Sequence, residues 1–326
     1  MIEKMIKEQY GLRAESVKRL ETGAGSNTYF IETGKGKYIL KDIAVNEMNN
    51  PKAEPELVGF LQSKGIPVAL FVKNRRGGYV FEEAGKIYHL QNYIEGETLE
   101  LNSAPDWFLT QSAQMLGRIH QTLKDYEPLP VGIGESFFKF MTPENAEKSY
   151  RKTLEHAKSQ NDLQVVSDLE YRLTQLKNLS NVNLELDCFT RTNTHGDYFI
   201  SQIICGKETI NAVIDWTSAC VHPVCWEVIR SFTCADPGCK NGEIDIGRFI
   251  SYVREYLKYG RLNSYDLKRM PYLFYYQIGV CDYYHQYYQS SAANRSIFLH
   301  QAVFATKLMR WFEFNIRELS EKLREV

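Results

Sequence analysis

The sequence lacks a hydrophobic stretch long enough to cross a bilayer, and its first residues lack the uninterrupted apolar segment of a secretory signal. It also lacks internal repeats and regions of low complexity. Neither sign of charge dominates, because 39 Lys and Arg residues are matched by 40 Asp and Glu residues. These absences argue against a membrane or a nucleic acid as a partner. We therefore expect a cytoplasmic protein, whose oligomeric state the sequence leaves open.

Cysteine is present in an odd number, seven, which is typical of reduced thiols rather than of a disulfide framework. Four cysteines lie close together around His222, namely Cys220, Cys225, Cys234 and Cys239. A zinc site is one interpretation. However, the first two cysteines are spaced more loosely than in the usual zinc knuckle, and Cys225 falls in an expected buried helix. We therefore favour small buried hydrophobic residues.

The secondary-structure pattern changes character after about one third of the chain. Before Glu95 the sequence mostly alternates as strands do, with expected helices at residues 2–9 and at Glu54–Lys64. After Glu95, helical periodicity dominates. The expected strands are Val17–Thr22, Thr28–Thr33, Tyr38–Ile43, Leu70–Lys73, Gly78–Glu82 and Tyr88–Ile94. This pattern predicts an α+β protein with a small β-rich N-lobe, residues 1–94, and a larger, mainly helical C-lobe, residues 95–326.

A glycine loop, with Gly23, Gly25, Ser26 and Asn27, separates the first two expected strands. Glycine lets the backbone approach a phosphate closely. A dinucleotide-binding fold needs a helix after such a loop, and a P-loop needs Gly-Lys followed by Ser or Thr; the sequence has neither here. The remaining interpretations are a loop that covers phosphates between two strands, as in protein kinases, and a plain hairpin turn.

Lys41 lies on the third expected strand, where alternation places it on the same face as Ile39 and Ile43. A lysine between apolar neighbours is costly unless it is paired. It could bind the α- and β-phosphates of a nucleotide, with a carboxylate from the following helix holding the lysine. Glu54 is the better candidate for that carboxylate, and Glu56 is the alternative. The simpler interpretation is a solvated lysine at a strand edge.

Two aspartates give the strongest signal: Asp197 in His195-Gly196-Asp197, and Asp215 in Val213-Ile214-Asp215-Trp216. A short hairpin expected between them places both carboxylates at its ends. Phosphoryl transfer needs such a pair, one carboxylate to orient the attacking hydroxyl and accept its proton, and one to hold Mg²⁺. The alternative is a pair of loop-capping aspartates. Asp215 argues against it, because an ionised group at the end of an apolar strand needs a cation or hydrogen bonds.

These motifs together resemble the aminoglycoside phosphotransferase and choline kinase family, whose fold is similar to that of protein kinases. The resemblance covers nearly the whole chain. The two aspartate motifs are quite specific to the family. The weaker matches are the glycine loop, Lys41, a linker at Asn92-Tyr93-Ile94-Glu95-Gly96, and Leu116-Gly117-Arg118-Ile119-His120.

The resemblance implies a kinase that uses ATP or GTP with Mg²⁺ and acts on a hydroxyl of a small molecule such as an aminoglycoside, a sugar or an amino alcohol. It assigns Asp197 as catalytic base, Asp215 as metal ligand, and Lys41 with Glu54 as the ion pair on the phosphate side. The remaining nucleotide-binding positions that it implies are Gly23, Gly25, Ser26, Asn27, Asn92 and Ile94.

Two positions depart from the family pattern. Position 202 is Gln where the family usually has Asn as a second metal ligand, so the amide oxygen lies one methylene farther from the backbone. Gln202 therefore motivates an alternative function, a nucleotide-binding pseudokinase or scaffold. Glu227 stands where the family usually has Asp, and we expect it to hold the catalytic loop.

The acceptor side is less defined. Pro271–Gln289 is rich in aromatic residues, and Asp282 recurs at helical spacing with Tyr275. One interpretation is an aromatic and acidic pocket for an amine or a sugar, with Asp282 and Tyr275 as substrate contacts. We favour helix packing for most of these aromatics. A protein kinase is disfavoured, because little room for a peptide-docking loop remains between Asp215 and Trp226.

Overall fold

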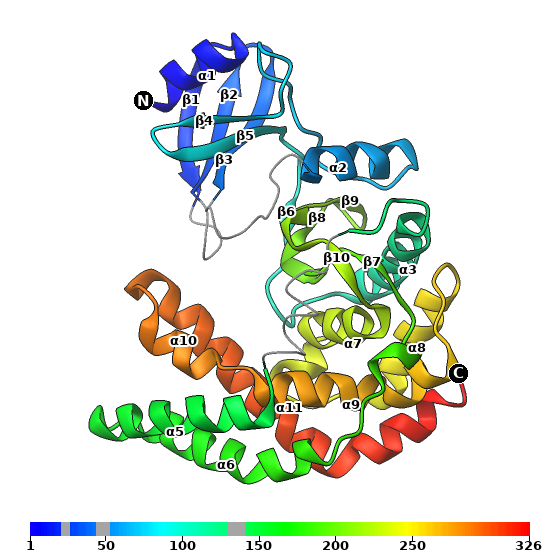
Figure 1. Ribbon diagram of the computed structural model, residues 1–326. Coiled ribbons are helices and arrows are strands. Elements are labelled where there is room, and N and C mark those ends of the chain that lie inside the picture. Colours follow the sequence, from blue (N-terminus) through cyan, green and yellow to red (C-terminus); the bar gives the residue numbers. More distant parts are fainter. Residues whose placement is uncertain (21–26, 44–52, 130–140) are drawn as a thin grey trace. The chain divides into compact units, whose positions relative to one another are not determined.

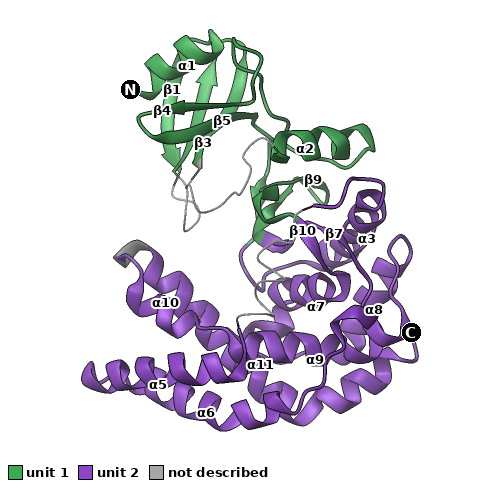
Figure 2. Ribbon diagram, viewed as in Figure 1, with its two compact units in different colours: residues 1–99, 201–219 green, residues 100–200, 220–326 purple. Residues whose placement is uncertain are grey.

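The computed structural model describes residues 1–20, 27–43, 53–129 and 141–326. Contacts divide it into two compact units, residues 1–99 with 201–219 and residues 100–200 with 220–326 (Figure 2). The boundary between lobes expected at residue 94 stays a prediction. The contacts also show that residues 201–219, which follow the expected catalytic loop, pack with the first unit.

The first unit contains a five-stranded antiparallel sheet with the strand order β1-β2-β3-β5-β4 (Figure 1). Its elements are α1 (Ile2–Tyr10), β1 (Ala14–Leu20), β2 (Thr28–Thr33), β3 (Gly36–Ile43), α2 (Ala53–Ser63), β4 (Val80–Glu83) and β5 (Lys86–Asn92). The strand expected at Leu70–Lys73 is wrong. That segment forms only an isolated bridge between Phe71 and Gln91, and its backbone bonds to residues near the end of β5.

A second sheet in the first unit has the order β6-β8-β9, formed by β6 (Glu97–Thr98), β8 (Ile203–Cys205) and β9 (Ile210–Val213). The short 3₁₀ helices η2 (Ile200–Gln202) and η3 (Trp216–Ser218) precede and follow this hairpin. Gly96 has φ 134°, and a Cβ there would lie 2.3 Å from the carbonyl oxygen of Cys205. The linker after β5 therefore needs glycine at this position.

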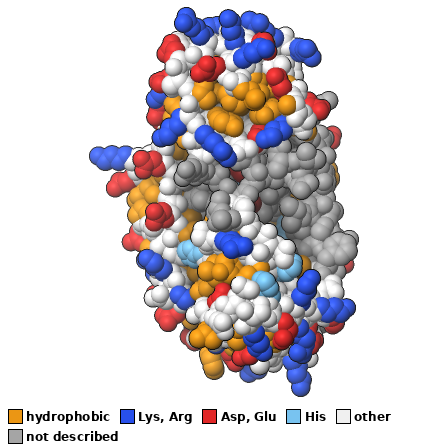
Figure 3. Space-filling view, turned by 90° about the vertical axis from the view of Figure 1, so that its left-hand side faces the viewer, with side chains coloured by type: hydrophobic (Ala, Val, Ile, Leu, Met, Phe, Trp, Pro, Cys, Tyr) orange, Lys and Arg blue, Asp and Glu red, His pale blue; other side chains and the backbone are white. Residues whose placement is uncertain are grey.

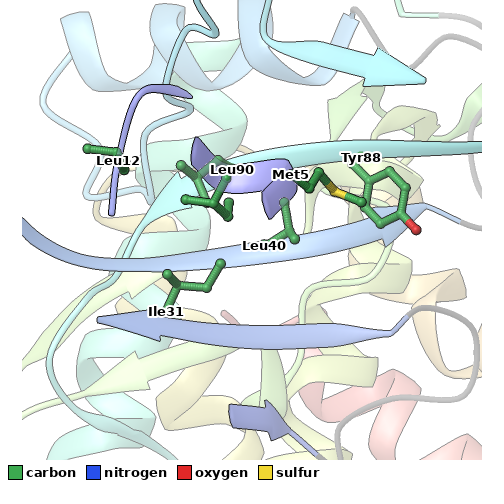
Figure 4. Close-up of a cluster of buried hydrophobic side chains, with 7 residues drawn as sticks. Met5, Leu12, Ile31, Leu40, Tyr88 and Leu90 are labelled. Atoms are coloured by element: carbon green, nitrogen blue, oxygen red, sulfur yellow. The ribbon is translucent and has the colours of Figure 1, made fainter. Parts of the chain in front are cut away.

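The core of the first unit lies between α1 and the five-stranded sheet. Its buried members are Met5, Ile6, Leu12, Ile31, Leu40, Tyr88 and Leu90 (Figure 4). Leu40 and Leu90 are directly opposite in the β3–β5 register and are fully buried. Because side chains alternate along a strand, Lys41 projects from the other face of β3. Burial of Leu40 thus fixes the direction of the lysine.

The second unit is mainly helical, with one two-stranded antiparallel sheet, β7 with β10. Its elements are α3 (Asp106–Leu123), α5 (Pro143–Ser159), α6 (Leu163–Ser180), η1 (Leu186–Cys188), β7 (Arg191–Thr194), β10 (Cys220–Pro223), α7 (Val224–Ala235), η4 (Pro237–Asn241), α8 (Ile246–Leu257), α9 (Ser264–Val280), α10 (Tyr283–Gln289) and α11 (Ala292–Leu323). A small antiparallel sheet unit and a larger helical unit confirm the expected α+β class.

The aromatic segment on the acceptor side is not one continuous helix. α9 ends at Val280 and α10 begins at Tyr283, with Asp282 as its N-terminal flanking residue. The expectation that Asp282 and Tyr275 lie on one helical face is therefore wrong. Tyr275 is buried, its hydroxyl donates to the Gln175 side chain at 3.4 Å, and its ring packs against Phe312, so it belongs to the packing of α9 against its neighbours.

The surface carries charges of both signs, and most of the cysteines are buried. Charged side chains of both signs are interspersed on the face shown in Figure 3. Within the described ranges, no helix has the length and apolar character that a membrane span requires. No set of three or more potential metal ligands gathers among those residues either, and all seven cysteines are free thiols. The zinc interpretation thus has no support, while Cys220, Cys225 and Cys239 are buried as small hydrophobic residues.

Candidate active site

Lys41 and Asp215 form an ion pair in the first unit. The Lys41 ammonium nitrogen lies 3.2 Å from both carboxylate oxygens of Asp215, and the two side chains are 16% and 31% exposed. Lys41 comes from β3, and Asp215 lies two residues after the end of β9. The lysine predicted to bind phosphates and the aspartate predicted to bind metal are therefore brought together.

Asp215 has an unusual backbone conformation, with φ 61° and ψ 67°. Few residues other than glycine adopt this left-handed region, and Asp and Asn tolerate it best. The Thr217 hydroxyl donates to Asp215 Oδ1 at 2.8 Å. One residue earlier, the Ile214 N–H donates to the Gln202 carbonyl at 3.0 Å. The hairpin thus brings Gln202 and Asp215 to the same end, whereas metal binding by the Gln202 side chain stays a prediction.

Glu54 is buried on α2, and its Oε1 accepts a hydrogen bond from the Trp216 N–H at 3.1 Å. It therefore holds the residue that follows Asp215. Glu56 is exposed on the same helix, which supports the preference for Glu54 over Glu56. The ion pair of Glu54 with Lys41 stays a prediction. The hydrogen bond from Trp216 shows that α2 contacts the segment that carries Asp215.

Asp42 and Asn27 connect β3 to the end of the glycine loop. Asn27 donates to the buried Asp42 carboxylate from its backbone at 2.5 Å and from its side chain at 2.7 Å, and Lys86 donates at 2.8 Å. Burial favours a raised pKa of Asp42, but the bonds from Lys86 and Asn27 outweigh it and lower the pKa. The predicted loop residues Gly23, Gly25 and Ser26 lie outside the described residues.

His89 lies opposite Lys41 in the β3–β5 pairing and is buried against Phe71. Burial lowers the pKa of His89 to about 3, and the nearby Lys41 charge acts in the same direction. The imidazole is therefore neutral at physiological pH, so it adds no positive charge beside Lys41.

The expected adenine-binding linker begins at the end of β5. The Asn92 N–H donates to the Leu70 carbonyl at 2.8 Å, and the Tyr93 N–H donates to the Lys37 carbonyl at 3.1 Å. These two amides are used within the first unit, and the nucleotide contacts of Asn92 and Ile94 stay predictions.

Asp197 lies in the second unit, on the loop that follows β7. Its N–H donates to His195 Nδ1 at 3.2 Å, and Gly196 provides the left-handed conformation, φ 78°, that this turn requires. Arg230 of α7 donates from Nη2 to Asp197 Oδ1 at 2.6 Å. The predicted catalytic carboxylate therefore has a cationic partner, which sequence reasoning did not identify.

A buried hydrogen bond between two side chains supports the same loop from behind. Glu227 Oε2 lies 2.9 Å from His120 Nε2, both side chains are almost completely buried, and Glu227 Oε1 accepts from the Tyr198 N–H at 3.4 Å. Burial favours a raised pKa of Glu227, but His120 outweighs it and lowers the pKa. These contacts confirm that Glu227 holds the loop.

Asp282 lies between α9 and α10, where it is half-buried and accepts a hydrogen bond from Gln286 at 2.8 Å. The next residue, Tyr283, lies close enough to Arg230 and Asp197 for their charges to influence its pKa, which burial raises. The start of α10 is therefore near Asp197 within the second unit, and the substrate roles of Asp282 and Tyr275 stay predictions.

The model of the phosphotransferase enzyme family matches residues 16–259. This match spans well over half of the chain. The chain belongs to the phosphotransferase enzyme family. The expected small-molecule kinase class is thereby confirmed. Among curated proteins, no sequence matches this phosphotransferase with significance.

Several solved structures with similar folds are small-molecule kinases or phosphotransferases. An amicoumacin kinase in complex with AMP-PNP, Ca²⁺ and Ami has a TM-score of 0.66 and 17% identity, over 95% of this chain and 92% of that one. A spectinomycin phosphotransferase bound to ADP and spectinomycin has a TM-score of 0.63 and 14% identity, over 100% and 98%. A microcompartment-associated aminopropanol kinase has a TM-score of 0.63 and 13% identity, over 97% and 98%. These similarities confirm the predicted kinase-like fold.

Three residues of this phosphotransferase were missing from the predicted site: Asp42, His120 and Arg230. His120 was part of a motif used for the resemblance, without a role. Arg230 lies one helical turn after Glu227, so the spacing along α7 was available as a signal. Asp42 follows Lys41 directly, but its partners Asn27 and Lys86 come from other strands or loops, and only the tertiary structure shows them.

Proposed function

We propose that this phosphotransferase moves the γ-phosphate of ATP or GTP to a hydroxyl of a small molecule that resembles an aminoglycoside, a sugar or an amino alcohol. The observation that supports this most is the Lys41–Asp215 pair, which lies on the strand and hairpin expected for phosphate and metal binding. Neighbours of similar fold that bind AMP-PNP with Ca²⁺, or ADP, support a nucleotide and a divalent cation. Reduced cysteines fit the cytoplasmic location that we propose.

In the proposed reaction, the acceptor hydroxyl oxygen forms a bond to the γ-phosphorus while the bond from that phosphorus to the β–γ bridging oxygen breaks. Asp197 orients the hydroxyl and accepts its proton, so the products are a phosphate monoester and a nucleoside diphosphate. Lys41 binds phosphate oxygens of the nucleotide, and Glu54 keeps the Asp215 segment in place through Trp216. Asn92 and Ile94 of the linker contact the nucleotide base.

The oxygen donors near Lys41 are suitable for a hard divalent cation. Asp215 supplies a carboxylate whose two oxygens already face a cationic group, the Lys41 ammonium. Gln202 supplies an amide oxygen from the segment bonded to Ile214. We propose that these two side chains hold Mg²⁺, which neutralises charge on the β- and γ-phosphates when bound.

A radiolabelling screen tests this function against the scaffold alternative. The protein is incubated with Mg²⁺ and γ-labelled ATP or GTP, and with a panel of acceptors such as 1-amino-2-propanol, spectinomycin, hygromycin B and glycerol. The kinase predicts label in a phosphate monoester of at least one acceptor. Tight nucleotide binding by calorimetry without transfer to any acceptor of a broad panel would support the pseudokinase or scaffold instead.

The variant Gln202→Asn tests whether glutamine at position 202 has weakened the metal site or abolished it. If the longer amide weakens metal binding, the shorter Asn raises transfer at low Mg²⁺, because the oxygen then lies one methylene nearer the backbone. The transfer rate as a function of Mg²⁺ concentration measures this effect. An unchanged Mg²⁺ dependence in both Gln202→Asn and Gln202→Ala would remove Gln202 from the proposed metal site.

A further inference from the structure

Arg230 makes an unusually close contact with the proposed catalytic carboxylate. Its Nη2 donates to Asp197 Oδ1 at 2.6 Å, and the two side chains are 19% and 33% exposed. Charge-assisted bonds of this length are among the stronger ones in proteins. A carboxylate that must orient a hydroxyl therefore has one of its two oxygens fixed by a cation.

The guanidinium is itself held by two aromatic rings. It lies 4.7 Å from the ring centre of Phe199 and 5.2 Å from that of Trp226. Trp226 in turn packs on the imidazole of His222, at 4.6 Å between ring centres. Such cation–π contacts restrict the motion of an arginine side chain. Arg230 is thus a fixed group, in contrast to a flexible surface arginine.

α7 contacts the catalytic loop at two successive points. Glu227 accepts from the Tyr198 N–H, and Arg230, one turn later, donates to the Asp197 carboxylate. The first contact fixes the backbone of the loop, and the second fixes the side chain that does the chemistry. A single helix therefore controls both the position and the orientation of Asp197.

The burial of Arg230 is not favourable in itself. Its Nη1 is buried and has no hydrogen-bond partner among the described residues. A buried donor without a hydrogen-bond partner lowers the stability of the folded state. An arginine at such a position is therefore better explained by a role in function than by a contribution to stability.

We propose that Arg230 is a positioning residue, which fixes the Asp197 carboxylate in the orientation that receives the acceptor hydroxyl. This inference rests on the proposed function and assigns a residue that the expected site lacked. In phosphoryl transfer the base acts mainly by orienting the nucleophile, so the orientation of the carboxylate matters more than its basicity. Cys234 and Tyr283 lie near the same pair, and Tyr283 begins α10 on the acceptor side.

The test uses the acceptor and nucleotide that the wild-type enzyme uses best in the radiolabelling screen. Arg230→Met lowers kcat by about 10²-fold, as small displacements of catalytic groups do, whereas the KM for the nucleotide is unchanged because the proposed nucleotide contacts come from the first unit. Arg230→Lys recovers only part of kcat, since an ammonium does not match the planar guanidinium. Arg151→Met, at an exposed arginine paired with Glu147 on α5, is the matched control with wild-type kinetics.

Chemical rescue distinguishes positioning from support of the fold. Added guanidinium at millimolar concentration restores part of the kcat of Arg230→Ala by occupying the space between the two rings, and it does not restore Asp197→Asn. Thermal unfolding verifies that the variants are folded. A kcat of Arg230→Met equal to that of wild type, or loss of activity in Arg230→Ala without any rescue in the folded protein, would overturn the inference. If the proposed function itself is wrong, the wild-type protein transfers label to no acceptor in the radiolabelling screen, which is a separate outcome.

Discussion

Asp42 is a buried carboxylate next to Lys41, and it depends on Asn27 and Lys86 for compensation of its charge. Its lowered pKa means that ionised Asp42 stabilises the folded state above the pKa of the unfolded chain, about 4. This stabilisation is lost as the pH falls through the folded-state pKa. The free energy of unfolding of Asp42→Asn is therefore about 1–3 kcal/mol lower than that of the wild type at pH 7. On acidification it decreases less than that of the wild type.

Urea denaturation at several pH values between 7 and 3 measures this effect of Asp42. Glu82→Gln, at an exposed carboxylate of β4, is the control whose curves follow those of the wild type. An acid dependence of Asp42→Asn identical to that of the wild type would show that Asn27 and Lys86 do not stabilise the ionised carboxylate.

At the scale of single residues, the sequence identified those whose chemistry is visible locally. Asp197 and Asp215 were recognisable because each has a distinctive motif, and Lys41 because it lies between apolar neighbours. Arg230 was not, since its spacing from Glu227 places both on one helix face but does not show that the guanidinium meets Asp197. The contact between Lys41 and Asp215 likewise depends on how β3 and the β8–β9 hairpin pack, which no local pattern records.

At the scale of elements, alternation predicted strands well where both strand partners are regular, as at Thr28–Thr33. It failed for Leu70–Lys73, whose alternation is similar but which forms a single bridge. The sequence pattern also did not show that α9 ends at Val280. The buried Arg172 of α6 donates to the Ile278 and Cys281 carbonyls, so an arginine from another helix stabilises the end of α9, and helical periodicity alone could not show it.

Two glycines in helices give opposite predictions. At Gly117 of α3, an added Cβ would lie 2.5 Å from the Tyr256 carbonyl oxygen of α8, whereas at Gly59 of α2 it would meet nothing within 4 Å. Gly117→Ala therefore destabilises the fold by about 1–3 kcal/mol, although alanine favours helix. Gly59→Ala stabilises it by up to about 1 kcal/mol, because only helix propensity acts there.

Thermal and urea unfolding of the two alanine variants, measured side by side, checks the packing of α3 against α8. Equal shifts of the same sign would mean that helix propensity decides at both sites, and the close approach at Gly117 would then be wrong.

At the scale of the whole molecule, the residues with proposed roles are divided between the two compact units. Lys41, Glu54 and Asp215 belong to the first, while Asp197, Glu227 and Arg230 belong to the second. The sequence predicted two parts because strand patterns give way to helical patterns near Glu95. It did not predict that residues 201–219 pack with the first unit, because the pairing of β8 with β6 joins segments about one hundred residues apart.

The measurement that tests the account most directly compares Asp197→Asn with Asp215→Asn. Both changes nearly preserve side-chain shape, and asparagine tolerates the left-handed backbone at position 215. Calorimetry gives the affinity for Mg²⁺ with nucleotide, and the labelling assay gives the rate of transfer, for the same preparations. Asp197→Asn is predicted to bind nucleotide as the wild type does and to transfer phosphate at least about 10²-fold more slowly, while Asp215→Asn loses the gain in affinity from Mg²⁺. Transfer by Asp197→Asn at the wild-type rate would contradict the account.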